Sequence, residues 1–450
     1  MLLPRAEPVL GPGAAVVPLL ADEQVRAAQR RTVWVLAAAQ VAGGLGIGAA
    51  VSVGGLLALD ISGSEIWAGG STTAATLGAA LLALPLAAVA ARRGRRHSLS
   101  LGWALAAMGA ALVVLAAITG SYVVLLVGML LAGSGNATNF QSRYAAADLA
   151  LPTKRARDLS LVVWSTTVGT VLGPNLSEPG RIVAETLHIP PLVGPFVFAA
   201  VGMGVAAALI LTLLRPDPLL MSQRLAAAEP QVPETGNAGS SLPDDSAPAS
   251  SVRATVWRNA DARLGMSAIV LSHGVMVAVM TMAPVQLRHH GATLTIIGLT
   301  ISLHIAGMFA FSPIFGWLAD RSGRVATIVV GQALLAAAAL TAGTASDSEP
   351  RLMAGLILLG LGWSAGLVAG STLLAESVSM AMRTRVQGTS DLLMNLVGAA
   401  GGALSGVLLA LIGFGGLNAV AGLLIAPTLF FAVTGRRQRR LTQASFGEAG

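Results

Sequence analysis

The sequence contains no cysteine and few charged residues, and both absences narrow the classes of protein it can encode. Without cysteine among the 450 residues, disulfides and thiolate chemistry are excluded, and a soft metal ligand would have to come from methionine. Charged residues make up 11% of the chain and hydrophobic residues 54%, and the mean hydropathy is +0.74. This balance excludes an ordinary soluble domain. Residues 1–31 lack a basic stretch followed by an apolar core, so we expect no cleavable signal peptide.

Sequence motifs for nucleotide and zinc chemistry are missing as well. The chain has no G-x-x-x-x-G-K-[ST] loop and no three-ligand zinc spacing, so we expect neither an ATP-driven pump nor an enzyme, and no cofactor. The net charge of +7 comes from short basic clusters between apolar runs. That distribution follows the positive-inside rule, and we expect no nucleic-acid partner.

Twelve apolar runs are each long enough to cross a bilayer as a helix. They cover residues 33–58, 70–91, 98–118, 121–149, 159–177, 191–214, 263–286, 294–318, 325–345, 351–376, 388–412 and 415–434. Because irregular backbone cannot face lipid and the runs do not alternate as in a barrel, we predict an all-α integral membrane protein. We therefore expect the lipid bilayer to be one of the partners of this protein.

The basic clusters set the orientation of these spans. They fall in every second loop and at both ends of the chain, so we expect both termini in the cytoplasm and the protein in the inner membrane. Residues 1–31 would form a cytoplasmic N-terminal segment and 436–450 a cytoplasmic tail. Residues 216–262 are rich in Pro, Ser, Ala and acidic residues, which predicts a cytoplasmic linker that is helical only near its ends.

The two parts of the chain on either side of this linker repeat each other. Residues 87–96 align with 316–325, and Asp148 aligns with Glu376 at nearly the same offset. Two independent matches imply parallel six-helix halves, which we place at 32–215 and 263–435.

The repeated loop resembles a motif of the major facilitator superfamily. Gly316-x3-Asp320-Arg321-x-Gly323-Arg324 matches the loop that this family places between the second and third helices of a half. The first-half copy has Ala87 and Ala91 in place of the glycine and the acid. The resemblance implies the family's fold of 12 transmembrane helices in two halves, which rock around a midplane site in a secondary transporter.

Charged residues gather at the predicted cytoplasmic mouth, where they could latch the closed state. The structural alternative is that they only set topology, because exposed ion pairs contribute little stability. The predicted latch consists of Arg92, Arg95, Asp148, Gly316, Asp320, Arg321, Gly323, Arg324, Glu376 and Arg383.

Histidine and methionine recur at helical spacing on the seventh and eighth spans. His273, Met276 and Met280 share one face, and His304 and Met308 share another. Imidazole and thioether suit Cu(I). We expect Met276 to meet both histidines near the midplane, with Met280 above them and Met308 below. The pattern also resembles the CcoA-type copper importers of the same superfamily, which implies Cu(I) as the substrate.

Two other interpretations remain open for the cargo. Gly169-x3-Gly173-Pro174 resembles the antiporter motif of the family and favours a proton-coupled transporter of a small organic solute, in drug or metabolite efflux or vitamin-like uptake. Asn139 and Arg143 would give its cavity a polar, positive wall, and no acidic residue is expected near mid-span. Alternatively, the histidines serve only as helix contacts. We expect a monomer.

Overall fold

The computed structural model describes residues 16–63, 70–172, 176–228, 251–289, 291–345 and 348–435. Within these ranges all regular secondary structure is helical. In chain order the helices are α1 (Val16–Ser62), α3 (Gly70–Arg93), α4 (Arg95–Thr119), α5 (Tyr122–Ala147), α6 (Arg155–Leu172), α7 (Ser177–Thr186), the short 3₁₀ helix η2 (Pro191–Val193), α8 (Gly194–Leu213), α9 (Pro218–Ala228), α10 (Val252–Arg258), α11 (Ala260–His289), α12 (Leu294–Phe309), α13 (Ser312–Ser322), α14 (Arg324–Gly343), α15 (Glu349–Glu376) and α16 (Met380–Leu423). A last helix covers 425–435.

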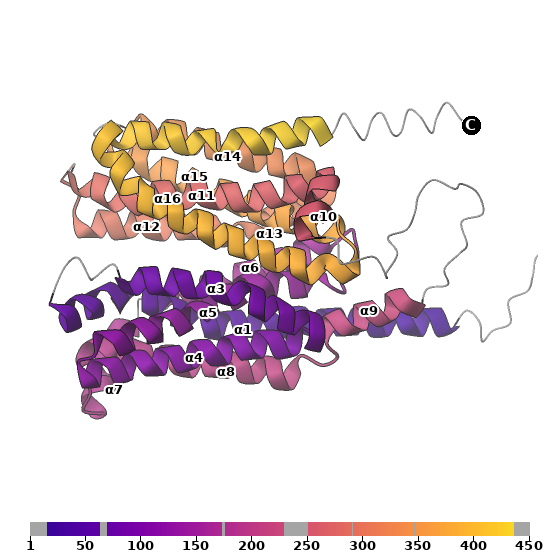
Figure 1. The fold of residues 1–450 in the computed structure, drawn as a ribbon, viewed down its shortest axis with the longest axis horizontal. Helices are drawn as coiled ribbons and strands as arrows, with labels where there is room; N and C mark the ends of the chain where they lie inside the picture. The colour runs from indigo at the N-terminus through magenta and orange to yellow at the C-terminus, as the bar shows by residue number, and fades with distance from the viewer. Residues whose placement is uncertain are drawn as a thin grey trace, which may run out of the picture.

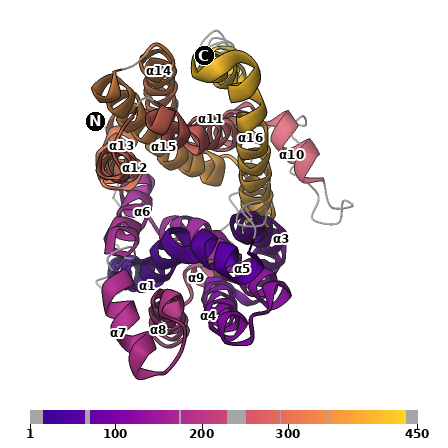
Figure 2. The ribbon, with the colours of Figure 1, turned by 90° about the vertical axis from the view of Figure 1, so that its left-hand side faces the viewer.

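These helices form two bundles that lie side by side. Figure 1 shows the first half, α1 to α8, below the second half, α11 to α16, with the long helices running along the same direction. The loops that contain the basic clusters lie together at one end, near α9 and α10, and we call this the basic end. Figure 2 views the molecule from its other end and shows the two bundles facing each other.

The predicted fold class is confirmed, and the described parts of the predicted spans, apart from 294–318, coincide with these helices. Nine segments among the described residues are long and apolar enough to cross a membrane. One of them, Met380–Gly435, contains both of the last two predicted spans. Gly413 separates these two spans, because its φ of 69° and ψ of 178° interrupt the helix.

The span predicted at 294–318 is not one continuous helix. It is divided into α12 and α13 at residues 310–311, directly before Pro313. Proline has no N–H to donate and is favoured in the first turn of a helix, where that N–H would have no partner. The proline therefore starts a new helix instead of continuing the old one.

Segments outside the spans agree only partly with the prediction. Helix α1 already begins at Val16, so residues 16–31 of the predicted N-terminal segment are helical and continuous with the helix of the first span. Helices α9 and α10 are the two helical ends of the predicted linker. The middle of that linker, residues 229–250, and the tail 436–450 lie outside the described residues.

Two glycines turn the chain at equivalent places in the two halves. Gly94 joins α3 to α4 with a φ of 86°, and Gly323 joins α13 to α14 with a φ of 92°. A side chain would strain both positions, because this left-handed region is costly for residues with a Cβ atom. The repeated loop motif thus keeps its turn glycine in both copies.

The buried apolar residues form one cluster in each half and a third that joins the halves. The third cluster brings Leu159 and Val163 of α6 together with residues of the second half such as Leu264, Ala268 and Ala319. Leu159 and Ala319 lie within a turn of the basic-end termini of their helices. The halves are therefore packed together at the basic end.

Candidate functional site

A cavity of about 560 Å³ lies between the two halves. Its walls come from α3 and α5 of the first half and from α11 and α16 of the second. Thr72 stands near the start of α3 and Thr281 near the end of α11, which places this central cavity toward the end opposite the basic end. The volume is in the range of sites for small molecules. The polar and aromatic side chains that line it include Thr72, Thr76, Asn136, Phe140, His273 and Asn395.

His273 is oriented in this cavity by a tryptophan of α15. The indole N–H of Trp363 donates a hydrogen bond of 3.1 Å to Nδ1 of His273, and the Phe140 ring meets the imidazole edge-on at 6.2 Å. Because indole can only donate, Nδ1 must be unprotonated and the neutral ring has its hydrogen on Nε2. His273 therefore offers a hydrogen-bond donor, not a lone pair, to the cavity that it lines.

An ion pair between the halves lies one helical turn below the cavity, toward the basic end. Nη2 of Arg143 on α5 is 2.7 Å from Oδ1 of Asp391 on α16, and both side chains are fully buried. Arg143 also lies over the ring of Phe140, which lines the cavity. The expectation that Arg143 makes a positive cavity wall is wrong, because Asp391 neutralises it.

Asn139, the other predicted cavity residue, holds the first half together. Its Oδ1 accepts hydrogen bonds from Gln40 of α1 and, at 3.0 Å, from Thr166 of α6. Gly169 lies against α1, where an added Cβ would come within 2.5 Å of the carbonyl oxygen of Val41. Gly173 and Pro174, which complete the antiporter-like pattern, lie outside the described residues.

The proposed copper ligands lie on two helices that both pack against α15 (Figure 2). His304 donates through Nδ1 to the carbonyl oxygen of Leu356 on α15 at 2.7 Å, whereas His273 accepts from Trp363 on the same helix. Met276 and Met308 are buried, and Met280 is half-buried. Among the described residues, no three His, Asp or Glu side chains converge to hold a metal ion.

At the basic end, Asp320 caps a helix of the opposite half. Its carboxylate accepts hydrogen bonds from the backbone N–H groups of Ala156 (3.2 Å) and Arg157 (2.9 Å) in the first turn of α6. A carboxylate at this position satisfies amides that have no partner within the helix and interacts favourably with the helix dipole. This contact joins the two halves.

Arg324 and Glu376 add further polar contacts between the halves to that of Asp320. We call this group of polar contacts a joint. Arg324 binds Glu376 and Asp320, each at 3.1 Å, and donates to the carbonyl oxygen of Pro152 in the first half. Arg155 of the first half lies 3.3 Å from Glu376. Arg321 instead lies over the ring of Trp317.

The equivalent residues of the first half make a matching joint. Arg95 pairs with Asp148 at 2.8 Å, which corresponds to the pairing of Arg324 with Glu376 at 3.1 Å. Arg95 also reaches across to Gln387 of α16 at 2.6 Å. Sequence reasoning missed Gln387, which has no counterpart in the motif. Arg383 is half-buried near Asp148 and Glu376, and Arg92 is exposed.

Small residues let the halves approach closely at both joints. An added Cβ on Gly316 of α13 would lie 2.2 Å from Oγ of Ser160 and 2.8 Å from the carbonyl oxygen of Ala156, both on α6. In the repeat, Ala87 of α3 replaces this glycine, and the facing residue on α16 is Gly388, whose added Cβ would lie 2.4 Å from that of Ala87. The missing glycine of one copy is thus supplied by the opposite helix.

Replacing Gly316 by valine should open the basic end. Since the backbone carbonyl of Ala156 cannot rotate away as a side chain could, α13 must move away from α6. Maleimide labelling of a reporter, Ser312→Cys, measures this, because Ser312 is fully buried and donates to Ser160 across the halves. We expect labelling at least about tenfold faster, the effect of roughly 1.4 kcal/mol. Gly298→Val is the control, because nothing lies within 4 Å of its added Cβ; equal rates in the two variants would contradict this packing argument.

Replacing Asp320 by asparagine should have a smaller effect of the same sign. The amide keeps one acceptor for the first turn of α6 but loses the charge and the second acceptor, which together contribute about 1 kcal/mol. Labelling of the Ser312→Cys reporter should therefore rise about fivefold. Asp60→Asn is the control, because Asp60 is exposed and is distant in the sequence from Asp320. Unchanged labelling would mean that the carboxylate sets topology only.

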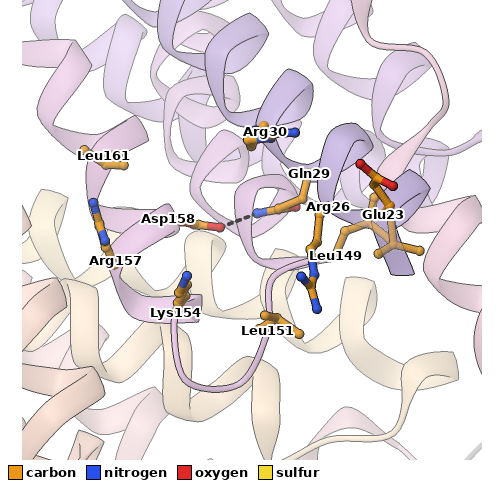
Figure 3. Close-up of a pocket in the computed structure, with 11 residues that line it drawn as sticks. Glu23, Arg26, Gln29, Arg30, Leu149, Leu151, Lys154, Arg157, Asp158 and Leu161 are labelled. Carbon is orange, nitrogen blue, oxygen red and sulfur yellow. Dashed lines mark hydrogen bonds between the residues drawn. The ribbon is translucent and has the colours of Figure 1, made fainter. Parts of the chain in front are cut away.

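A larger cavity at the basic end does not lie between the halves. It has about 930 Å³ and is lined only by residues of the first half, on α1, α6 and the loop before α6 (Figure 3). Gln29 crosses it to donate to Asp158 at 2.7 Å. Burial raises the pKa of the Asp158 carboxyl, and the hydrogen bond from Gln29 opposes that shift. Because one half alone lines this cavity, it is not part of a pathway that opens when the halves part.

Comparison with known proteins agrees with this two-bundle geometry. A model of the Major Facilitator Superfamily matches residues 36–290 and 264–449. The chain belongs to the Major Facilitator Superfamily. As a member of the superfamily it is a membrane transporter. The two matched regions overlap, and together they cover both halves of the chain.

Three curated members of the superfamily are similar over most of the chain. The uncharacterized transporters YddS and YdeG of Bacillus subtilis are 39% and 38% identical, each over 89% of this chain and 91% of its own. The riboflavin transporter RfnT of Brucella anthropi is 30% identical over 82% of this chain and 86% of its own.

Two solved structures share the fold at low sequence identity. The human organic anion transporter MFSD10 superposes with a TM-score of 0.65 at 19% identity, covering 90% of this chain and 99% of its own. A bacterial homologue of the iron transporter ferroportin, in an outward-facing state, has the same TM-score at 15% identity, covering 90% and 98%.

Proposed function

We propose that the protein carries a small, uncharged organic solute with a flat ring and hydrogen-bond acceptors, by alternating access. The observation that supports this most directly is the central cavity, which is lined by neutral polar groups and the Phe140 ring. Among the described residues the amide of Asn136 has no hydrogen-bond partner, so it is available to a solute together with Nε2–H of His273. The similarity to a riboflavin transporter supports a solute of this class and makes riboflavin the first probe.

We also propose how the protein sits in the membrane. The positive-inside rule places the basic end in the cytoplasm, with the protein in the inner membrane and both termini inside. The described conformation, joined at the basic end with its cavity toward the other end, then corresponds to the outward-facing state. A single chain supplies both halves of the pathway, which supports a monomer.

Copper remains the second candidate because of His304. Its Nδ1–H donates to a backbone carbonyl, and Nε2 is buried with no hydrogen-bond partner among the described residues. This is the arrangement in which histidine binds metals, with the second nitrogen fixed by an acceptor. His273 has the opposite arrangement, because its second nitrogen is held by a donor, and this is why we rank the organic solute first.

Counterflow in proteoliposomes tests the two candidates together. Vesicles preloaded with unlabelled riboflavin should take up labelled riboflavin faster with the protein than without it, whereas no exchange would refute riboflavin as a substrate. Parallel vesicles receive Cu(I). If copper is the cargo, Met276→Leu/Met280→Leu should abolish its uptake, because leucine keeps the volume and removes the ligand. Met266→Leu, near the start of α11, is the control.

A further inference from the structure

A groove of about 360 Å³ lies on the second half at the basic end, away from the central cavity. Helix α10 forms one wall, and α11, α16 and the last helix form the others. Figure 2 shows α10 on the outer side of α16, outside the two bundles. We call this space the lateral groove. Because it lies at the periphery of the molecule, it faces the bilayer and not the pathway between the halves.

The inner part of the lateral groove is apolar and continues into the surface that faces lipid. Met266 and Val270 of α11 line it and are buried. Leu393 of α16 also lines it but is exposed, as is Leu396 one turn further along the same helix. Exposed leucines on a membrane-spanning helix face hydrocarbon, because acyl chains surround the spans. The groove is therefore open to an acyl chain from the side.

The outer part of the lateral groove is positively charged. Arg253 and Arg263 line it, and the described residues around it include no acid. Arg263 is held in place, because it donates to the carbonyl oxygen of Trp257 and lies 5.8 Å from the centre of the Phe431 ring. Its Nε is buried and has no hydrogen-bond partner among the described residues. A fixed guanidinium with an unused donor is suited to bind a phosphate.

Helix α10 has the pattern of a helix that lies at a membrane surface. Val252 and Val256, four residues apart, pack against the apolar core of the second half. Arg253 and Arg258 are exposed, and so is most of Trp257. Tryptophan is enriched where headgroups meet acyl chains, and a basic polar face attracts anionic lipids. The groove thus combines an apolar slot and two cations at the depth of the lipid headgroups.

We propose that the lateral groove binds one anionic phospholipid from the leaflet at the basic end. The phosphate lies between Arg253 and Arg263, and one acyl chain lies in the groove against Leu393. This lipid ties α10, and with it the end of the linker, to the second half. The inference concerns a site outside the transport pathway and does not depend on the cargo.

Segments of the chain outside the described residues fit the groove less well. Residues 436–440 of the tail include four arginines and would be repelled by the groove. The linker carries Asp244 and Asp245, which have the right charge. However, its residues 229–250 are mostly small or polar and offer little to fill an apolar slot. The linker is therefore the competing occupant that the experiment must separate.

Native mass spectrometry of the delipidated full chain tests the inference. The protein is titrated in detergent with phosphatidylglycerol or with phosphatidylcholine of the same acyl chains, which is zwitterionic. The unmodified protein should bind one phosphatidylglycerol with a Kd at least about tenfold lower than that of phosphatidylcholine. Arg253→Gln/Arg263→Gln should raise the Kd of phosphatidylglycerol about 25-fold, about fivefold for each arginine, and remove the preference. If Arg263→Gln does not fold, the exposed Arg253→Gln should still give about fivefold.

Arg92→Gln/Arg93→Gln is the matched control, because it removes the same charge from exposed positions at the same end of the molecule. It should leave both Kd values unchanged. Equal weakening in the control and in the groove variant would overturn the site, because it would show that only the overall charge matters.

Two further arms separate a bound lipid from a free phosphate and from the linker. Thr389→Phe fills the groove and keeps both arginines, so it should weaken both lipids. Unchanged binding in this variant, or displacement of the lipid by equimolar glycerophosphoglycerol, would overturn the proposal in favour of a phosphate site. Lipid binding that occurs only after Asp244→Asn/Asp245→Asn would identify the linker as the occupant. Since no cargo is present, failure here is distinct from failure of riboflavin exchange.

Discussion

Removing the acid of the buried pair should destabilise the protein more than removing the base. Asp391→Leu leaves Arg143 as an unpaired cation that cannot lose its proton, at a cost of about 3–5 kcal/mol. Arg143→Met leaves a carboxyl that can become neutral instead, so its cost should be smaller and should shrink further at low pH. Thermal unfolding in detergent at two pH values measures both effects.

The double variant serves as the control for this asymmetry. Arg143→Met/Asp391→Leu removes both charges and replaces them with apolar groups, which is often neutral for buried pairs. Its midpoint should return close to that of the unmodified protein and should not vary with pH. Equal losses in both single variants at every pH would show that the carboxyl stays ionised even when alone.

Solute recognition should depend on the tryptophan that orients the cavity histidine. His273→Leu removes the donor that faces the cavity, which should raise the KM of the transported solute about 5- to 150-fold, the equivalent of about 1–3 kcal/mol. Trp363→Phe keeps an aromatic ring but releases Nδ1, so the imidazole can change tautomer and a smaller loss should follow. Riboflavin counterflow at varied concentration measures both.

Trp257→Phe is the matched control, because Trp257 lies on α10 and is largely exposed. It should leave the KM unchanged. If Trp363→Phe behaves like this control while His273→Leu is impaired, the histidine binds the solute without help from the indole.

Hydropathy was enough to predict the fold, because a bilayer requires long apolar helices. The repeated loop added the two halves, and Gly94 and Gly323 occupy its turn in both copies. The break between α12 and α13 could also have been predicted from Pro313. It was missed because a proline inside an apolar run of that length can also merely kink a helix.

The site was harder to predict, because its partners are distant in the sequence. His273 was recognised as a candidate, yet its tautomer depends on Trp363, 90 residues away. No acidic residue was expected near mid-span, and the pairing of Asp391 with Arg143, 248 residues apart, depends on how the halves meet. The Met and His spacing predicted single helix faces but could not indicate that α15 packs against both helices.

The close contacts at Gly316 and Gly388 affect how fast the halves can separate. Where large side chains interlock, two surfaces must disengage them one after another, and each step contributes to the activation barrier. Here the backbone of Gly316 meets Ser160, and the backbone of Gly388 meets Ala87. These contacts can separate without rotamer changes. The temperature dependence of the conformational switch should therefore report two events, the hydration of the charges at the polar joints and the separation of the apolar cluster around Leu159 and Leu264.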